Sequence, residues 1–280
     1  MIAVPAGGRM GNQMFQFAFA HAASRRLGTT FAFVAPRRAS QRRELGPPLW
    51  HTFELGSWRR RALRVRRDAR LRLGGALETV DVGQHEEPDD VLARLRDSVC
   101  YRGYFQSERW FAGHEDDVRR LFTVRGPVLA EFRARYEPRR PYICMHVRRT
   151  DYVDTQAWAL PTSYFHDALA AVPDCDRYEL VVVSDDPRTV RRELHDLPAR
   201  CEARPAAVDL LLLTHAAVVI TSNSSFSWWG AWLNRRPGLR VVAPRHWFGF
   251  AHGVEEPARV IPPGWTTIDV RDPPLLASPV

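Results

Sequence analysis

Lysine is absent from this sequence, so all 40 of its basic residues are arginines. The formal net charge is +8, and the stretch from Arg59 to Arg72 supplies +7 of it, since it holds eight arginines and only Asp68. That leaves +1 for the rest of the chain, so the basicity belongs to one segment. A pI near 9.9 with this distribution does not by itself indicate a nucleic-acid ligand.

Cysteine and long apolar runs are also scarce. The four cysteines are Cys100, Cys144, Cys175 and Cys201. They form no C-x-x-C pair, which argues against a zinc knuckle or a dithiol redox motif. The longest apolar stretch, residues 208–220, contains Thr214 and His215 and is shorter than the roughly 20 residues that span a bilayer. The first residues lack the features of a signal peptide, so we expect a cytoplasmic protein, with peripheral contact at the inner membrane face as an option.

The chain is long enough for two domains. It has 280 residues, of which 45% are hydrophobic and 26% charged, a composition typical of globular proteins. A domain commonly contains about 100–200 residues. Residues 137–141 are charged and flanked by prolines, and they mark the best boundary. We predict an N-terminal domain over residues 1–138 and a C-terminal domain over residues 139–280.

Apolar runs alternate with helical patterns along the chain. The N-terminal part predicts strands over residues 2–4 and 30–34, joined by a glycine loop and a helix, with further helices over 90–97 and 116–136. The C-terminal part predicts strands over 142–147, 178–184, 217–222 and 239–243, and helices over 162–171, 187–194, 207–215 and 226–234. Continuous apolar strands separated by helices indicate an α/β fold whose parallel sheets are covered on both faces. Ligands of such sheets bind at the carboxyl ends of the strands.

A glycine-rich loop follows the first strand. It leads through Gly11, Asn12 and Gln13 into the first helix, where backbone N–H groups could hold an anion. The glycine spacing does not match the dinucleotide-binding fingerprint. A plain turn between strand and helix is the alternative.

Two arginines follow the strand over residues 142–147. His146 is the last but one residue of this strand, and Arg148, Arg149 and Asp151 follow the strand. Guanidinium groups at a strand end suit a diphosphate, and a hydrogen bond to a charged group contributes about 1.5–3 kcal/mol. A surface Arg–Asp pair is the alternative interpretation.

Two further strands end in polar residues. Ser184, Asp185 and Asp186 either cap the next helix or bind a base, a ribose or a metal ion. The run 221–227 offers hydroxyl, amide and N–H groups to phosphate or sugar oxygens. The aromatic residues that follow it are expected in the core, since Phe226, Trp229 and Leu233 share one helical face.

Five motifs together resemble a known enzyme family. In chain order they read GGRMGNQMFQFAF, GYFQSERWF, HVRRTDYV, VSDDP and SNSSFSWWGAWLN. They are similar to motifs of the alpha-1,2-fucosyltransferases of glycosyltransferase family eleven, and the resemblance covers residues 7–247 except for a weak stretch over 36–72. It implies a GT-B fold, in which two Rossmann-like domains enclose a donor cleft. It also implies an inverting, metal-independent reaction that requires no cofactor, with GDP-L-fucose as donor and a galactose-terminated glycan as acceptor.

The resemblance also implies roles for individual residues. Arg148 and Arg149 would contact the donor diphosphate, with Arg148 as the principal catalytic residue and with His146 and Asp151 shaping the loop. The remaining donor contacts would come from Ser184, Asp185 and Asp186 near the guanosine, from Asn223, Ser224, Ser225, Phe226 and Ser227 near the β-phosphate and fucose, and from Gly11, Asn12 and Gln13 on the acceptor-side N-terminal domain. No general base can be chosen.

Three positions depart from the family pattern and concern the acceptor. Thr150 stands where many members have glycine, Phe17 where tyrosine is common, and Arg9 where leucine is common. One alternative function is a related GDP-sugar transferase with another linkage or acceptor. Another is a non-enzymatic binder of anionic lipid or RNA that uses the stretch from Arg59 to Arg72. The same stretch could serve an enzyme as a peripheral contact with an anionic membrane.

Overall fold

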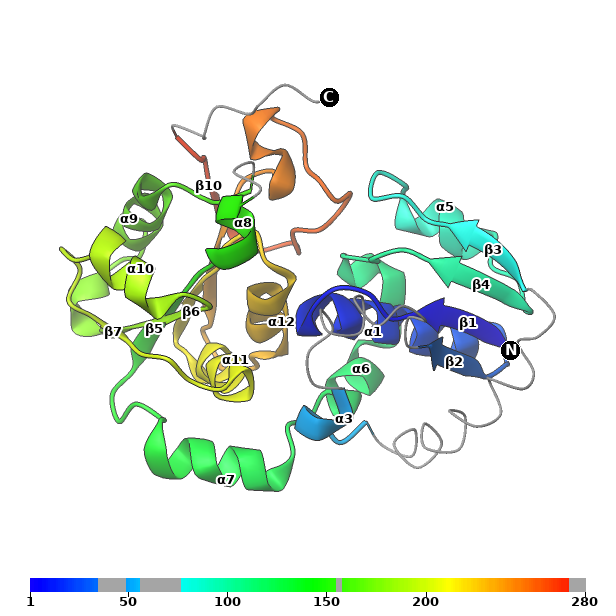
Figure 1. Ribbon diagram of the computed structural model, residues 1–280, viewed down its shortest axis with the longest axis horizontal. Coiled ribbons are helices and arrows are strands. Elements are labelled where there is room, and N and C mark those ends of the chain that lie inside the picture. Colours follow the sequence, from blue (N-terminus) through cyan, green and yellow to red (C-terminus); the bar gives the residue numbers. More distant parts are fainter. Residues whose placement is uncertain (35–48, 56–76, 155–157, 272–280) are drawn as a thin grey trace. The chain divides into compact units, whose positions relative to one another are not determined.

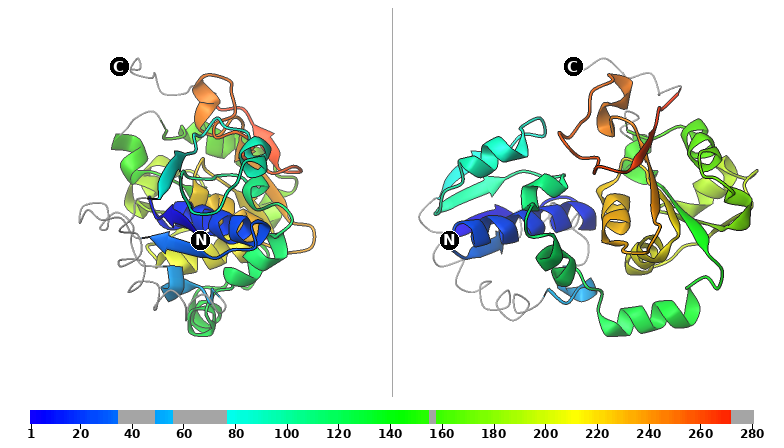
Figure 2. Two further views of the ribbon diagram at one scale, coloured as in Figure 1. Left: turned by 90° about the vertical axis from the view of Figure 1, so that its right-hand side faces the viewer. Right: turned by 180° about the vertical axis from the view of Figure 1, so that it is seen from behind.

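The computed structural model describes residues 1–34, 49–55, 77–154 and 158–271 (Figures 1 and 2). They form two compact units. The first contains Met1–Gly126 and Pro257–Val260, and the second contains Pro127–Glu256 and Ile261–Val280. The stretch from Arg59 to Arg72 lies outside the described residues, so its membrane contact stays a prediction. Within the described ranges, no helix combines the length and the apolarity that crossing a membrane requires.

The first unit contains a parallel four-stranded sheet in the order β2-β1-β4-β3. Helix α1 packs against β1 and β2 (Figure 1), and it buries Phe15, Phe17 and Phe19. The Phe19 ring stacks on Phe105 with 3.8 Å between centroids. The expected strand–helix–strand start is therefore confirmed. The elements are β1 (Ile2–Pro5), α1 (Met10–Arg26), β2 (Phe31–Val34), α3 (Leu49–Thr52), β3 (Glu78–Asp81), α5 (Pro88–Ala93), β4 (Val99–Arg102), η1 (Glu108–Phe111) and α6 (Glu115–Leu121).

The second unit contains a parallel six-stranded sheet in the order β10-β9-β8-β5-β6-β7. The central strand β5 is buried along its whole length. Its elements are α7 (Gly126–Arg135), β5 (Tyr142–Val147), α8 (Thr150–Asp154), α9 (Thr162–Ala170), η2 (Cys175–Arg177), β6 (Glu179–Ser184), α10 (Pro187–Glu193), β7 (Ala199–Cys201), α11 (Ala206–His215), β8 (Val218–Ile220), α12 (Ser225–Leu233), β9 (Arg240–Pro244), η3 (Phe248–Ala251) and β10 (Thr266–Ile268).

Both faces of β5 are covered by helices. Ile143 and Met145 join a cluster with residues of α9 and α10, whereas the hydroxyl of Tyr142 on the opposite face donates to the Leu212 carbonyl of α11. Successive strand residues point to opposite faces, so a strand buried on both sides must be apolar throughout. The predicted α/β fold with covered parallel sheets is confirmed.

The compact units divide between residues 126 and 127, whereas the sequence placed the boundary between 138 and 139. Helix α7 accounts for the difference, because its apolar side chain packs within the second unit. Phe132 is fully buried, and its ring lies 5.1 Å from the imidazole of His215. The Tyr136 carbonyl accepts a hydrogen bond from Arg200 at 3.1 Å.

The single helix expected over residues 116–136 is wrong, because the structure divides this region into α6 and α7. The chain between the two helices pairs with the segment that follows α3. Glu54 N–H donates to the Thr123 carbonyl at 2.9 Å, and Phe53 and Val124 form an antiparallel bridge. These backbone bonds replace the helical ones, and Pro127 then suits the first turn of a new helix.

Candidate functional site

Three predicted loops meet at the carboxyl edge of the second sheet. Strand β5 lies between β6 and β8, with Val147 opposite Ser184 and Met145 opposite Ile220. The chain leaves β5 toward β6 and later returns to β8 on its other side, so β5 and β8 flank the point where the strand order reverses. Ligands of open α/β sheets bind at this point. The polar residues after β5, β6 and β8 therefore form the candidate site.

Arg148 is held by two carboxylates. Its guanidinium donates to Asp151 Oδ1 at 2.6 Å and lies 2.8 Å from Asp185 Oδ2. The side chain is 11% exposed, its Cζ lies 5.2 Å from the centre of the Tyr152 ring, and its buried Nε has no hydrogen-bond partner in the described part of the chain. The guanidinium is therefore fixed in orientation.

Arg149 points into the protein. Its Nε donates to Glu193 at 2.6 Å, and its Nη1 donates to the carbonyls of Arg148 at 3.0 Å and Leu160 at 3.1 Å. The backbone N–H of Arg149 donates to Asp185 Oδ1 at 2.9 Å. The residue is only 4% exposed, so this network anchors the loop, and its contact with a diphosphate stays a prediction.

His146 is buried and neutral. Its Nδ1 lies 2.7 Å from Ser222 Oγ, and its ring lies 5.6 Å from that of Phe226. Burial, reinforced by the charge of Arg148, lowers the pKa of His146 to about 3. The imidazole therefore joins β5 to the loop after β8 by a hydrogen bond without adding charge.

Ser184, Asp185 and Asp186 have structural partners. Asp186 Oδ1 accepts a bond from the Thr189 N–H at 3.1 Å and caps α10, and this hydrogen bonding lowers the pKa of Asp186. Ser184 Oγ accepts a hydrogen bond from the Asp186 N–H at 3.0 Å. Asp185 accepts from the Arg149 N–H and so holds the arginine loop, residues 148–151. Capping, the alternative weighed for this motif, is confirmed for Asp186. Among the described residues, no group of three His, Cys, Asp or Glu side chains is placed to hold a metal ion.

The loop after β8 turns most of its polar groups inward. Ser224 Oγ accepts from the Phe226 N–H at 3.4 Å at the start of α12, and Ser227 Oγ donates to the Ser222 carbonyl at 3.3 Å. Asn223 is fully buried, its amide donates to the Trp158 carbonyl at 2.9 Å, and its Oδ1 has no hydrogen-bond partner among the described residues. Ser225 begins α12, whose N-terminus favours an anion.

The sequence interpretation missed three aromatic residues beside Arg148. The rings of Tyr152, Trp158 and Phe248 lie 5.4–6.1 Å apart, and Trp158 is 44% exposed. Tyr152 is part of the HVRRTDYV motif and could have been noticed, whereas Trp158 and Phe248 lie in segments without periodicity. Together they offer an apolar surface for a base or a sugar ring.

Gly11, Asn12 and Gln13 lie in the first turn of α1, in the first unit. Gln13 donates to the Gly8 carbonyl at 3.1 Å. Gly8 has a φ of +66°, and a Cβ there would lie 2.4 Å from Asn12 Nδ2, so this turn needs glycine. A contribution of these residues to a donor site stays a prediction.

A protein-family model matches residues 85–268, more than half of the chain, and its description is glycosyl transferase family 11. The chain belongs to this family. Among its relatives, an alpha-1,2-colitosyltransferase of Escherichia coli is 30% identical over 175 residues, 56% of this chain and 59% of the relative. A galactoside 2-alpha-L-fucosyltransferase of Caenorhabditis elegans is 30% identical over 150 residues, 47% of this chain and 41% of the relative. The chain thus spans three fifths or less of their length.

The family-11 chain also resembles a solved structure of POFUT1 in complex with GDP-fucose. The TM-score is 0.55 at 10% identity, and the alignment covers 86% of this chain and 97% of that chain. At this identity the likeness shows the fold, and it confirms the predicted GT-B type with two Rossmann-like units.

Proposed function

We propose that this family-11 glycosyltransferase moves L-fucose from GDP-L-fucose to the 2-hydroxyl of a galactoside. The observation that carries the proposal is the orientation of Arg148 at the strand-order reversal of the second sheet. A guanidinium fixed at a ligand-binding edge suits a phosphate, because it can donate two parallel hydrogen bonds. The relative named as a galactoside 2-alpha-L-fucosyltransferase supports the sugar and the linkage.

Binding of the diphosphate requires Asp151 to leave Arg148. Arg148 and Arg149 face three carboxylates, those of Asp151, Asp185 and Glu193, so the group carries no surplus positive charge. The Asp151 side chain is 51% exposed, and it can turn into solvent at little cost. A phosphate oxygen then takes its place on the guanidinium, while Asp185 keeps the arginine in position.

The proposed reaction is a displacement at the anomeric carbon. The galactoside 2-hydroxyl attacks C1 of fucose, the bond from C1 to the phosphate oxygen breaks, and GDP leaves with the electron pair on the opposite face. Arg148 stabilises the charge that develops on the leaving phosphate. No base is assigned for the hydroxyl proton. His146 does not serve as a cationic acid, because burial keeps it neutral.

The proposal is tested by measuring GDP release from GDP-fucose with lactose as acceptor. We expect Arg148→Ala to lower turnover by about 100-fold or more, as loss of a transition-state donor does in other enzymes. Arg188→Ala, on the exposed surface of α10, is the matched control and should retain turnover. NMR of the product gives the linkage. Equal turnover in wild type and Arg148→Ala contradicts the assigned role, and a product linked elsewhere than at the 2-hydroxyl contradicts the acceptor position.

A second candidate is transfer of another GDP-linked sugar. The relative named as an alpha-1,2-colitosyltransferase favours colitose. Thermal shift with GDP-fucose, GDP-colitose, GDP-mannose and UDP-galactose ranks the donors, because a ligand at about 100 times its Kd stabilises the folded state by about 2.7 kcal/mol. A larger shift with GDP-colitose than with GDP-fucose would replace fucose by colitose in the proposal.

A further inference from the structure

The first unit has its own strand-order reversal. Strand β1 lies between β2 and β4, so the chain leaves β1 on one side and returns through β4 on the other. The carboxyl ends of β3 and β4 continue into residues 82–84 and 103–106, beside the turn that follows β1. This edge is where a second ligand of an α/β protein is expected.

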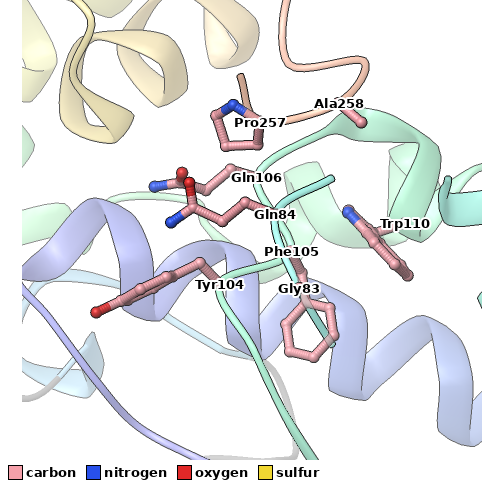
Figure 3. Close-up of a pocket in the computed structure, with 8 residues that line it drawn as sticks. All are labelled: Gly83, Gln84, Tyr104, Phe105, Gln106, Trp110, Pro257 and Ala258. Carbon is pink, nitrogen blue, oxygen red and sulfur yellow. The ribbon is translucent and has the colours of Figure 1, made fainter. Parts of the chain in front are cut away.

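A small pocket opens at this edge (Figure 3). Residues 83–84, 104–106 and 257–258 line it together with Trp110, and no lining side chain is charged. Its enclosed volume is about 10 Å³, which matches about one water-sized group. Arg259, next to the lining residue Ala258, pairs with Glu87 at 3.1 Å on the exposed surface. The pocket therefore suits a single neutral polar group such as a hydroxyl.

One lining side chain has an unused acceptor. Gln106 is 6% exposed, and its Nε2 donates to Asn12 Oδ1 at 2.7 Å. Its Oε1 is buried and has no hydrogen-bond partner in the part of the chain that the structure describes. Leaving such an acceptor buried without a partner destabilises the protein, so this atom requires a donor from a ligand or a water molecule.

An aromatic ring borders the same opening. Tyr104 is 40% exposed, and Figure 3 shows its ring on the side of the pocket toward which the carboxamides of Gln84 and Gln106 extend. An exposed ring face beside amide groups is suited to a sugar, because a sugar ring presents C–H groups on one face and hydroxyls at its edge.

Hydrogen bonds hold one wall of the pocket. The segment Pro257–Val260 is distant in sequence from the rest of the first unit but belongs to it, and two hydrogen bonds hold it there. Ala258 N–H donates to the Gln84 carbonyl at 2.9 Å, and Ser107 Oγ donates to the Arg259 carbonyl at 2.5 Å. A wall held in this way costs little ordering entropy on binding.

We propose that this pocket is a sugar-binding subsite for the glycan acceptor. One acceptor hydroxyl enters the pocket and donates to Gln106 Oε1, while the face of its sugar ring lies on Tyr104. The proposal rests on the proposed function, and it assigns acceptor selection to these two residues, which lie in the first unit. Neither residue contributes to the arginine loop.

Steady-state transfer from GDP-fucose to lactose tests the role of Tyr104. We expect Tyr104→Ala to raise the KM for lactose by about fivefold to tenfold, as loss of an aromatic contact does, while the Kd for GDP changes by less than about twofold. Tyr104→Phe retains the ring and should keep the wild-type KM. An unchanged KM in Tyr104→Ala, with turnover intact, overturns the subsite and leaves the donor proposal standing.

A series of monodeoxy lactoses tests Gln106. We expect wild type to bind one member about tenfold more weakly than lactose, and Gln106→Met to bind both equally, because only the wild type can use that hydroxyl. If each protein binds every monodeoxy lactose as tightly as lactose, Gln106 binds an ordered water only and the proposal fails. If wild type neither turns over nor binds GDP, the proposed function fails instead. Calorimetry of lactose with wild type and Tyr104→Ala then tests the subsite directly.

Discussion

Arg148 and Arg149 are neighbours in sequence but lie in different surroundings. Arg148 faces the carboxyl edge of the sheet, where a half-exposed Asp151 can be displaced. Arg149 lies over the Phe165 ring at 5.6 Å and binds Glu193 and two carbonyls. The HVRRTD motif predicted arginines at a strand end, but it could not separate the two, because the partners of Arg149 come from distant segments.

We therefore expect Arg149→Met to destabilise the fold. The substitution leaves Glu193 and two carbonyls without their donor, which costs about 3 kcal/mol. Urea unfolding measures the change, and Arg148→Met is the comparison, with a smaller loss expected because one of its partners, Asp151, is solvated. Equal losses in both variants would show that the two arginines share one structural role.

Asp209 gives the stability a pH dependence. This residue of α11 is buried, and the desolvation raises its pKa to about 7. The positive charge of Arg204 acts in the opposite direction but is the smaller effect. The unfolded chain releases the same proton near pH 4, so between about pH 4 and pH 7 the folded state binds more protons. The contribution of Asp209 to the free energy of unfolding therefore falls as the pH rises through that window, by up to about 4 kcal/mol.

The variant Asp209→Asn removes this titration. We expect its free energy of unfolding to fall less than that of wild type between about pH 5 and pH 8. The comparison isolates Asp209, since His146 and the other titrating groups are common to both proteins. Parallel pH profiles would show that the carboxylate is ionised at neutral pH in the folded state.

Among the elements, helix α12 is packed on more sides than its sequence predicted. Trp228, Trp229 and Trp232 are buried, whereas Phe226 and Leu233 of the expected face are only partly buried. Burial in the core is therefore confirmed for Trp229 but not for Phe226. This helix is apolar nearly all round and packs against α11.

The contact between α11 and α12 depends on Gly230. A Cβ at this position would lie 2.4 Å from Leu213 Cβ, so we expect Gly230→Ala to destabilise the protein by about 1–3 kcal/mol through overpacking. Leu213→Gly removes this Cβ, at its own cost from the cavity and from glycine within a helix. The double variant should therefore lose less stability than the two single losses together, as measured by denaturant unfolding. Additive losses would contradict the close contact.

The strands that the sequence did not reveal are mostly short edge strands. In β3, Glu78, Thr79 and Asp81 are exposed, and β7 and β10 have three residues each. An edge strand of this length carries too few apolar residues to show a period. The buried strands β5 and β6 were predictable, because both of their faces must be apolar.

At the scale of the whole molecule, the predicted strand ends showed where the candidate site lies, but the sequence did not predict which distant side chains contact it. The loops after β5, β6 and β8 were predicted, and the sheet order brings them to one edge. The aromatic group around Trp158 and the pocket at Gln106 were not predicted, because each joins segments that no local pattern links. Short motifs identify the chemistry, whereas the tertiary fold selects which side chains surround it.

The concentration of charge from Arg59 to Arg72 predicts a property of the whole molecule that the sheets do not explain. Its +7 is nearly the entire net charge, and a basic residue near an anionic membrane contributes about 1 kcal/mol. We expect the protein to sediment with phosphatidylserine vesicles and to be released as salt screens the attraction. Replacement of the eight arginines by glutamine should lower this binding by at least about tenfold.

Turnover of GDP-fucose by the same variant separates an accessory contact from the main function. A transferase that uses this segment only to reach a lipid-linked acceptor keeps its activity on soluble lactose, whereas a pure lipid or RNA binder has none to lose. Vesicle binding that survives the replacement would assign membrane contact to another surface. If the variant loses both turnover and vesicle binding, these arginines support the folded enzyme itself.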